Sequence, residues 1–531
     1  MTPRTAIAQL AKMVGHDIGR GEPSSNALAA GPMLASVGAT ADVVDCLFAE
    51  ARRKRPSDQL IIGYGFILQS ALESLRLDAN GGDPKARQGI QEVRQAVEKG
   101  LSRGDIPAAV LMLVARAFAE SQLDPGRPLQ EAMVGAIETM GDAVEMDPTV
   151  MTGHLAAVAK ALGDDPFAIH AEISSTGAAF PVEHRAAMAA AFAAADVPAI
   201  REAALGFVLD PDAEVSAAVL SVLASAGRSQ PVMSAAVERL VRMRPWLPEA
   251  RRADLDAAVR ALRPNAIAPA PTARPEIRNV LASMCDGSGA QSLFAIVKRG
   301  RRLALASVLV KAGVGVADAW VRDGMTKSEA EDMIDEIVTA ARAVDVSIGF
   351  VERRIADALA ENLDRGVPPP FGLLQATEAL GFGSLQPQAV SAATLVDELL
   401  ADLPSELTDT KASLASRRAS ARWIDEIETI RSWFEAGEAV EALLRPIKSR
   451  RKRVEAMLTE RLPARRTFWA ERCVWTAAML KEATDDGSRD WIDFALVARD
   501  FAGDQPLDTL PIAKLIAEAS VDVFAAQSGG G

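Results

Sequence analysis

Apolar residues recur every three or four positions along most of this chain, with polar residues between them. In the segment 213–225, for example, Val215, Val219 and Leu223 fall on one face of a helical projection. This spacing predicts amphipathic helices that each bury one face. In the first half of the chain it predicts helices at 41–54, 58–77, 84–99, 106–121, 128–145, 148–162, 182–194, 230–243 and 247–262.

The second half shows the same kind of pattern. It predicts helices at 277–284, 289–312, 326–344, 347–363, 389–401, 420–443, 447–461, 464–484, 488–500 and 508–526. Aromatic residues make up only 5% of the sequence, and alanine-rich runs such as 186–195 are frequent. Alanine is the best helix former, whereas sheets prefer aromatic and β-branched residues. The predicted fold class is therefore all-α.

The dipeptide Asp-Pro appears five times, always before residue 212. Four of the aspartates, Asp83, Asp124, Asp165 and Asp210, are separated by 41, 41 and 45 residues. Aspartate can accept hydrogen bonds as an N-cap, and proline at the first helical position loses no hydrogen bond. Each Asp-Pro therefore predicts the start of a helix. The spacing matches the 40–47 residues of a two-helix repeat.

On this spacing, residues 40–262 resemble the HEAT/armadillo superfamily of α-solenoids. The segment 209–225, "LDPDAEVSAAVLSVLAS", is most similar to a HEAT turn followed by a second helix, with Ser216 where arginine is usual. The resemblance implies a stack of helical pairs with an extended surface for partners. An irregular helical bundle with coincident Asp-Pro turns is the alternative interpretation.

Proline density predicts the main domain boundary. Four prolines fall within 263–276, which favours an extended spacer over a helix. Five of the seven tryptophans follow residue 420 and suggest a C-terminal domain with an aromatic core. The predicted organisation is a HEAT-like solenoid at 1–262, a linker at 263–276, a helical region at 277–388, a Trp-containing helical domain at 389–527 and a flexible tail at 528–531.

Composition restricts the cellular setting. Cys46, Cys285 and Cys473 are too far apart in sequence to form a disulfide framework or a metal motif, which indicates a reducing compartment. The apolar runs are about ten residues long, shorter than a membrane span, and the N-terminus lacks the apolar core of a signal peptide. We expect a cytoplasmic protein without membrane contact. The preference for arginine over lysine is typical of a GC-rich bacterial genome.

Few residues suggest chemistry. His154, His170 and His184 fall within 31 positions but lack the spacing of a helical metal site. The segment 312–318, "AGVGVAD", superficially resembles a phosphate loop, but it is preceded by an apparent helix and lacks a third glycine. A turn explains it more simply. No catalytic motif is found, so neither an enzyme nor a cofactor is predicted.

The strongest local signal is a basic block at 445–466, where nine of 22 residues are Lys or Arg and two are Glu. This local charge of +7 contrasts with −13 for the whole chain. A helix over 447–462 would bury one apolar stripe and expose cations that can neutralise phosphates. The candidate contact residues are Lys448, Arg450, Arg451, Lys452, Arg453, Arg461, Arg465 and Arg466.

The preceding segment 423–444 carries six acidic residues and one arginine. If it forms a helical hairpin with the basic block, the opposite charges offset each other within the domain. Three interpretations of the block stay open: internal pairing, nucleic-acid binding and binding of an acidic protein. Overall, the sequence predicts a non-enzymatic scaffold or adaptor with a protein partner of unknown identity; the alternative is a nucleic-acid-binding protein using 445–466.

Overall fold

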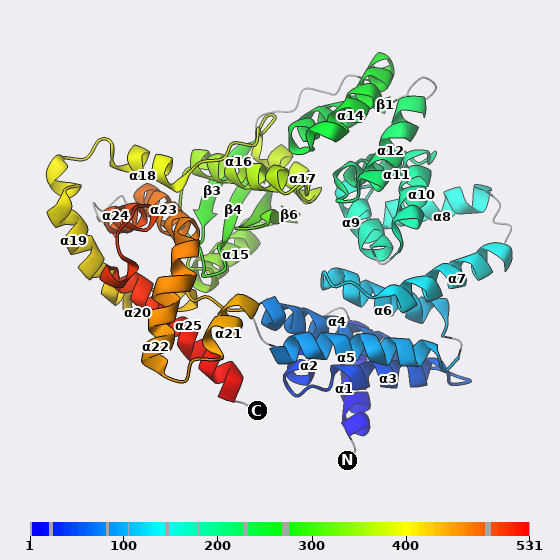
Figure 1. Ribbon diagram of the computed structural model, residues 1–531. Coiled ribbons are helices and arrows are strands. Elements are labelled where there is room, and N and C mark those ends of the chain that lie inside the picture. Colours follow the sequence, from blue (N-terminus) through cyan, green and yellow to red (C-terminus); the bar gives the residue numbers. More distant parts are fainter. Residues whose placement is uncertain are drawn as a thin grey trace. The chain divides into compact units, whose positions relative to one another are not determined.

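The computed structural model describes residues 3–20, 25–80, 84–104, 106–143, 148–178, 180–226, 232–267, 275–483 and 490–529. The chain divides into two compact units, unit 1 at Met1–Ala204 and unit 2 at Leu205–Gly531. Helices predominate in both, which confirms the predicted helical character (Figure 1). Unit 2 also contains a five-stranded sheet, so the all-α prediction is wrong in this respect.

Unit 1 is entirely helical in its described part. Its helices are α1 (Pro3–Ile18), α2 (Ser25–Ser36), α3 (Thr40–Ala51), α4 (Asp58–Asn80), α5 (Pro84–Leu101), α6 (Ala108–Glu120), α7 (Arg127–Ala143), α8 (Pro148–Ala161), α9 (Pro166–Gly177), α10 (Val182–Ala193) and α11 (Pro198–Ala204). The Asp-Pro prediction is confirmed at three of the five sites, whereas α7 and, in unit 2, α12 (Ala213–Ala226) begin two residues after Pro125 and Pro211. Helices α5, α8 and α9 begin at the proline, and the Asp165 carboxylate accepts a hydrogen bond from Phe167 N at 2.9 Å.

Helix α4 is the centre of unit 1, because it packs against α1, α2, α3, α5 and α6. Its buried residues Ile67, Leu68 and Leu72 belong to the main hydrophobic cluster. Of the described residues, Asp58–Ala79 is one stretch long and apolar enough to cross a membrane, and the bent pair Ala27–Ser36 and Thr40–Ala51 passes the same test together. A helix surrounded by five others departs from simple stacking of neighbours. The solenoid therefore stays a prediction.

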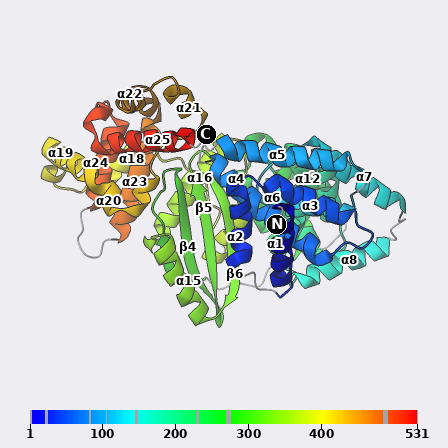
Figure 2. The same ribbon diagram turned by 90° about the horizontal axis from the view of Figure 1, so that it is seen from below.

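The sheet of unit 2 has the order β6-β5-β4-β3-β7 and is antiparallel throughout. Figure 2 shows β4, β5 and β6 next to one another. Its strands are β3 (Glu276–Ala282), β4 (Ala290–Arg299), β5 (Arg302–Lys311), β6 (Gly315–Met325) and β7 (Val344–Asp345). Phe294 and Ile296 of β4 face α15 (Lys327–Ala340). Gln291, of opposite parity on β4, instead contacts α16 (Ile348–Asp364) on the other face. Both faces of the sheet are thus covered by helices.

The helices predicted at 277–284 and 289–312 are therefore wrong, because these residues form β3, β4 and β5. A sheet covered on both faces needs no alternation of apolar and polar residues, so its strands read as continuous apolar runs. Position 300 marks the two-residue turn between β4 and β5, where Gly300 adopts a φ of +62°. The predicted turn in 312–318 is confirmed at 312–314, which connect β5 to β6, whereas the rest of the segment is the start of β6.

Around the sheet, unit 2 consists of helices. Before it come α12 (Ala213–Ala226), α13 (Ser234–Met243) and α14 (Glu249–Leu262); after it come α17 (Gly372–Leu380), α18 (Ala392–Leu400), α19 (Thr410–Ala419), α20 (Trp423–Glu426), α21 (Glu438–Leu444), α22 (Arg450–Ala456), α23 (Arg466–Ala483), α24 (Asp490–Ala502) and α25 (Pro511–Gly529). The five C-terminal tryptophans are all buried. The division at 204/205 differs from the predicted boundary at 263–276, of which 268–274 lie outside the described residues.

Candidate ligand-binding cleft

The basic block begins at the end of α21 and runs through α22 into α23. The predicted continuous helix 447–462 is interrupted, because a π-helical turn (Met457–Arg461) and a 3₁₀ turn (Leu462–Arg465) separate α22 from α23. Pro463 lies in this region, and proline lacks the N–H that a regular helix requires. The acidic segment 423–444 is likewise two short helices, α20 and α21, joined by a 3₁₀ turn, and not one long helix.

Two arginines of α22 contact α25. Both Arg450 Nε and Nη2 donate to the Asp522 carboxylate, at 3.0 and 2.9 Å. Arg453 Nε donates to the Ile447 carbonyl, and its guanidinium lies 4.8 Å from the centre of the Phe524 ring. These cations thus pair with the C-terminal helix and with the chain just before α22.

Glu435 holds the second part of the block. Its carboxylate is 4% exposed and accepts hydrogen bonds from Arg461, from Arg465 and from Trp469 Nε1 at 3.0 Å. Arg466 instead donates to carbonyls that follow α24, including Gly503 O at 2.8 Å. The structure thus brings Arg461 and Arg465 to the acidic segment, as the internal-pairing interpretation predicts for the block.

Lys448, Arg451 and Lys452 are the remaining candidate contact residues. All three are exposed, and the described part of the chain gives none of them an ion pair. Three exposed cations can neutralise only a few phosphates of a nucleic acid. Because each neutralised phosphate contributes about 0.9 to the slope of log affinity against log salt, the electrostatic part of such binding would be small.

The histidines do not form a common site in the described residues. His170 is buried on α9, and burial lowers its pKa to about 4 despite a hydrogen bond with the Ala203 backbone. It is therefore neutral at pH 7. His184 is exposed on α10, and the side chain of His154 lies outside the described part. No group of three or more His, Cys, Asp or Glu residues within the described ranges is placed to hold a metal ion.

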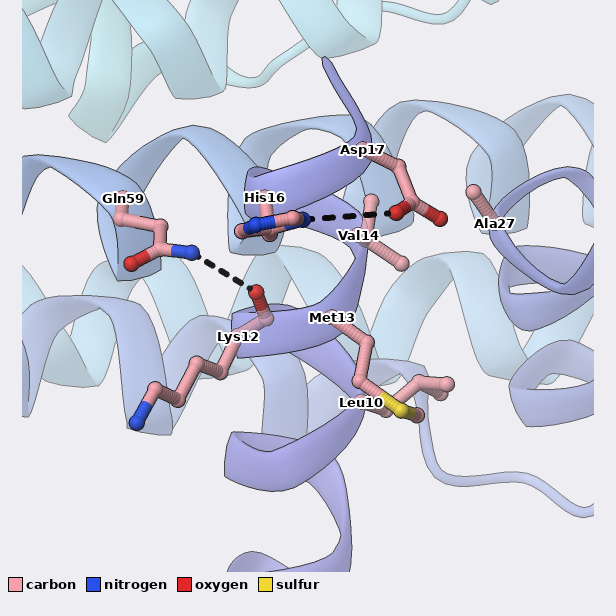
Figure 3. A pocket seen from close by; sticks show the side chains of 8 residues that line it. All are labelled: Leu10, Lys12, Met13, Val14, His16, Asp17, Ala27 and Gln59. Carbon is pink, nitrogen blue, oxygen red and sulfur yellow. Dashed lines mark hydrogen bonds and ion pairs between the residues drawn. The ribbon is translucent and has the colours of Figure 1, made fainter. Parts of the chain in front are cut away.

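Unit 1 has a pocket of about 350 Å³ between α1, α2 and α4 (Figure 3), and a second of about 360 Å³ beside α2, α3, α4 and α5. His16 Nδ1 lies 3.7 Å from Asp17 Oδ1 at the rim of the first pocket, and Gln59 Nε2 donates to the Lys12 carbonyl at 3.2 Å. His16 is mostly exposed. These polar groups are exposed to solvent or already paired. These groups therefore offer no buried, unpaired donor or acceptor to a ligand.

Unit 2 has a larger and strongly charged cleft of about 580 Å³. It lies between α16, the loop 387–391, α23 and the ends of strands β4 and β5. Its ionisable lining residues are Cys285, Arg354, Asp357, Glu361, Asp364, Glu471 and Arg472. A volume of this size lies within the range of small-molecule sites.

Arg354 forms one wall of the cleft and already has three side-chain partners. Its Nε donates to Gln291 Oε1 at 3.0 Å, and its Nη1 donates to Asp357 at 2.9 Å. The guanidinium also stacks over Trp475, 4.7 Å from the ring centre. Asp357 accepts a second hydrogen bond from Val390 N at 3.0 Å. The pair Arg354–Asp357 therefore ties α16 to the sheet, to α23 and to the loop 387–391.

Arg472 is different, because its guanidinium is buried without a carboxylate. The residue is 2% exposed, and its Nη1 donates to the Phe468 carbonyl. Nε and Nη2 have no hydrogen-bond partner in the described part of the chain. Gly289, with a φ of +79°, packs directly against this edge: a Cβ there would overlap Arg472 Nη2.

The Nε and Nη2 edge is the one with which arginine binds a carboxylate through two parallel hydrogen bonds. Five other arginines in the described ranges use that edge in this way. The pairs are Arg76–Glu73, Arg239–Glu378, Arg244–Asp256, Arg417–Asp500 and Arg450–Asp522. Arg472 lines the cleft, and these two donors are buried behind its wall with no acceptor among the described residues. Burial lowers its pKa to about 10, which leaves it charged at pH 7.

Three carboxylates of the cleft have raised pKa values. Burial is the main cause for Asp357, Glu361 and Glu471. For Glu471 the charges of Asp357 and Glu361 raise the pKa further, while Arg472 and Arg354 lower it. These carboxylates are thus close enough to repel one another. Shifted carboxylates in a cleft, beside a specific charge, are typical of functional sites.

Cys285 lines the same cleft as a buried thiol. Burial raises its pKa, and the charges of Arg354 and Arg472 oppose this shift. Its backbone carbonyl accepts a hydrogen bond from Trp433 Nε1 at 3.1 Å. A buried thiol with a raised pKa is a poor nucleophile.

The chain is similar to proteins of the Y4lR type. Two family models match it, "Y4lR second domain" over residues 181–265 and "Y4lR C-terminal helical domain" over residues 393–525. "Uncharacterized protein y4lR" of Sinorhizobium fredii (strain NBRC 101917 / NGR234) is 26% identical over 479 residues, covering 88% of both chains. No solved structure matches the chain.

Some lining residues of the cleft lie in the segment that matches the Y4lR C-terminal helical domain, and others lie outside both matched segments. Glu471, Arg472 and Trp475 lie within 393–525, whereas Arg354 and Asp357 precede it. Sequence reasoning missed this site because its residues are spread over nearly 190 positions and share no motif. The one local feature in the sequence is Gly289. A glycine is needed there because a side chain would overlap Arg472 of α23, and this contact is known only from the structure.

Proposed function

We propose that this chain is a binding protein whose recognition site is the charged cleft of unit 2. The observation that carries the proposal is that the buried Nε and Nη2 of Arg472, a residue of the cleft lining, have no hydrogen-bond partner in the described part of the chain. The ligand is a small molecule or a chain end that brings an anionic group to this edge.

A buried charge without a partner is costly, and the effective cost after relaxation is still several kcal/mol. The protein retains Arg472 in this state, although the same edge of other arginines, such as Arg239 and Arg417, binds a carboxylate. A ligand anion would complete the pairing and offset the cost on binding. Functional sites are where proteins keep such locally unfavourable arrangements.

A protein-interaction scaffold is a second candidate function, in line with the helical repeats predicted from sequence. It is supported by unit 1, which exposes large apolar side chains on α1, α2 and α4: Met13, Leu28, Met33 and Ile62. This function is compatible with a ligand site in unit 2. The nucleic-acid alternative rests on Lys448, Arg451 and Lys452 alone, since the other cations of the block are engaged within unit 2.

The test compares Arg472→Met with Arg417→Met by urea unfolding. Removing an unpaired buried charge should leave stability unchanged or raise it by about 1–4 kcal/mol. Breaking the buried Arg417–Asp500 pair should instead cost about 3–5 kcal/mol, since it leaves Asp500 unpaired. If Arg472→Met is as destabilising as Arg417→Met, Arg472 is structural and the proposal falls.

The same variant then reports on binding. In a thermal-shift panel of small carboxylates, phosphates and amino acids, at least one compound with an anionic group should stabilise the wild type. Saturation at about 100 times Kd would add about 2.7 kcal/mol. The gain should be absent from Arg472→Met and present in Arg450→Met, whose side chain lies outside the cleft. A panel in which no anion-bearing compound distinguishes Arg472→Met from the wild type contradicts the proposal.

A further inference from the structure

The charge balance of the cleft restricts what its ligand can be. Four carboxylates and two guanidinium groups line it, which leaves a net charge of −2 when all are ionised. Arg354 is paired with Asp357. Glu361, Asp364 and Glu471 therefore face a single further cation, Arg472. A ligand that is only anionic would be repelled by these carboxylates.

Glu471 is the carboxylate most ready to receive a ligand cation. It is half-buried on α23, next in sequence to Arg472, and it makes no hydrogen bond within the described residues. Glu361 accepts one hydrogen bond, from Gly313 N at the β5–β6 turn. A carboxylate has room for several donors, so both can accept hydrogen bonds from an ammonium or guanidinium group.

We infer that the cleft binds a cationic amino acid, with its carboxylate on the Nε and Nη2 edge of Arg472 and its cationic groups on Glu471 and Glu361. This inference rests on the proposed function and adds the class of ligand. The chemistry is shared by free arginine or lysine and by a peptide chain that ends in one of them. The two sources differ in the α-amino group, which is charged in the free amino acid and an amide in the peptide.

The experiment is calorimetric titration of the full-length chain with L-arginine and four compounds that each lack one or two of its charges. L-arginine has every group. Agmatine lacks the carboxylate, citrulline lacks the guanidinium charge, N-acetyl-L-arginine lacks the α-ammonium charge, and N-acetylglycine has the carboxylate alone. Lysine is titrated as a second cationic amino acid. Each is measured against the wild type, Arg472→Met and Glu471→Gln.

Arginine or lysine should bind the wild type, and agmatine and citrulline should each bind at least about tenfold more weakly, as expected for loss of a charged hydrogen bond. Arg472→Met should remove the difference between arginine and agmatine, and Glu471→Gln should reduce the difference between arginine and citrulline. Such compensation places each ligand group on its protein partner. Equal binding of N-acetyl-L-arginine and arginine identifies a chain end as the ligand; weaker binding of the acetylated compound identifies the free amino acid.

Different failures have different meanings. If N-acetylglycine binds and neither arginine nor lysine binds more tightly than about 1 mM, the inference is overturned while the proposed function stands. If agmatine binds as tightly as arginine, and Arg472→Met changes neither affinity, the carboxylate is not held by Arg472 and the proposed function falls as well.

Discussion

The carboxyl group of Glu471 makes the stability of the fold depend on pH. Burial raises the pKa of its carboxyl group, with Asp357 and Glu361 adding to the shift and Arg472 and Arg354 opposing it. The folded state therefore binds this proton more tightly than the unfolded chain, whose glutamates titrate near pH 4.3. The stability that Glu471 contributes is present below that pH and is lost as pH rises through the higher pKa of the folded state.

We predict that Glu471→Gln is more stable than the wild type at pH 7 and that the gain shrinks towards zero as pH falls to about 4.3. The measurement is urea unfolding of both proteins across this range. Glu276→Gln is the control of opposite sign, because a hydrogen bond from Lys298 lowers the pKa of Glu276. That variant should be less stable at pH 7 and approach the wild type at low pH. The same sign for both variants would contradict the prediction.

Among the elements, the helices could be predicted from sequence far better than the strands. Asp165-Pro166 marks a helix start through chemistry that is local to four residues. Strands β4 and β5 have no such signal, because both faces of their sheet are buried and their apolar runs resemble a buried helix. Their one local mark is Gly300 in the connecting turn. The cleft depends on which distant elements meet, and no local pattern contains that information.

Glu435 links the elements at the C-terminal end of unit 2. It lies between the 3₁₀ turn (Glu428–Ser432) and α21, and its carboxylate binds Arg461, Arg465 and Trp469. The two guanidinium groups are only about a quarter to a third exposed. This one side chain therefore connects the acidic segment to the π-helical and 3₁₀ turns that precede α23.

We predict that Glu435→Gln lowers the free energy of unfolding by about 3 kcal/mol, because two partly buried cations lose their counter-charge. The control is Asp522→Asn, which removes the carboxylate bound by Arg450. That pair is 57% and 60% exposed, so its loss should cost only about 0–1 kcal/mol. Chemical unfolding measures both. If the two variants lose similar amounts of unfolding free energy, burial does not determine how much these ion pairs contribute to stability.

At the scale of the whole molecule, the cleft and all its lining residues belong to unit 2. The segment before the sheet is bound to this unit as well. Arg239 on α13 pairs with Glu378 on α17 at 2.9 Å, and the buried Trp246 donates from Nε1 to the Leu385 carbonyl at 2.9 Å. Proline density at 263–276 predicted a boundary there, but proline reports only local backbone stiffness. Contacts made across it by distant side chains are not visible in sequence.

Two fragments test whether the second unit begins at residue 205, as the contacts indicate, or after the proline-rich segment 263–276, as the sequence predicted. We predict that 205–531 folds alone, keeps the ligand response of the full chain and unfolds with its own cooperative transition. Fragment 275–531 begins at the predicted boundary and lacks α12 to α14. It should unfold at a lower urea concentration, because it loses the buried Trp246 and leaves Glu378 without Arg239; burying an aromatic of this kind contributes about 3 kcal/mol or more. Circular dichroism with urea measures both. Equal midpoints for the two fragments would show that residues 205–274 add nothing to this unit and would favour the boundary predicted from sequence.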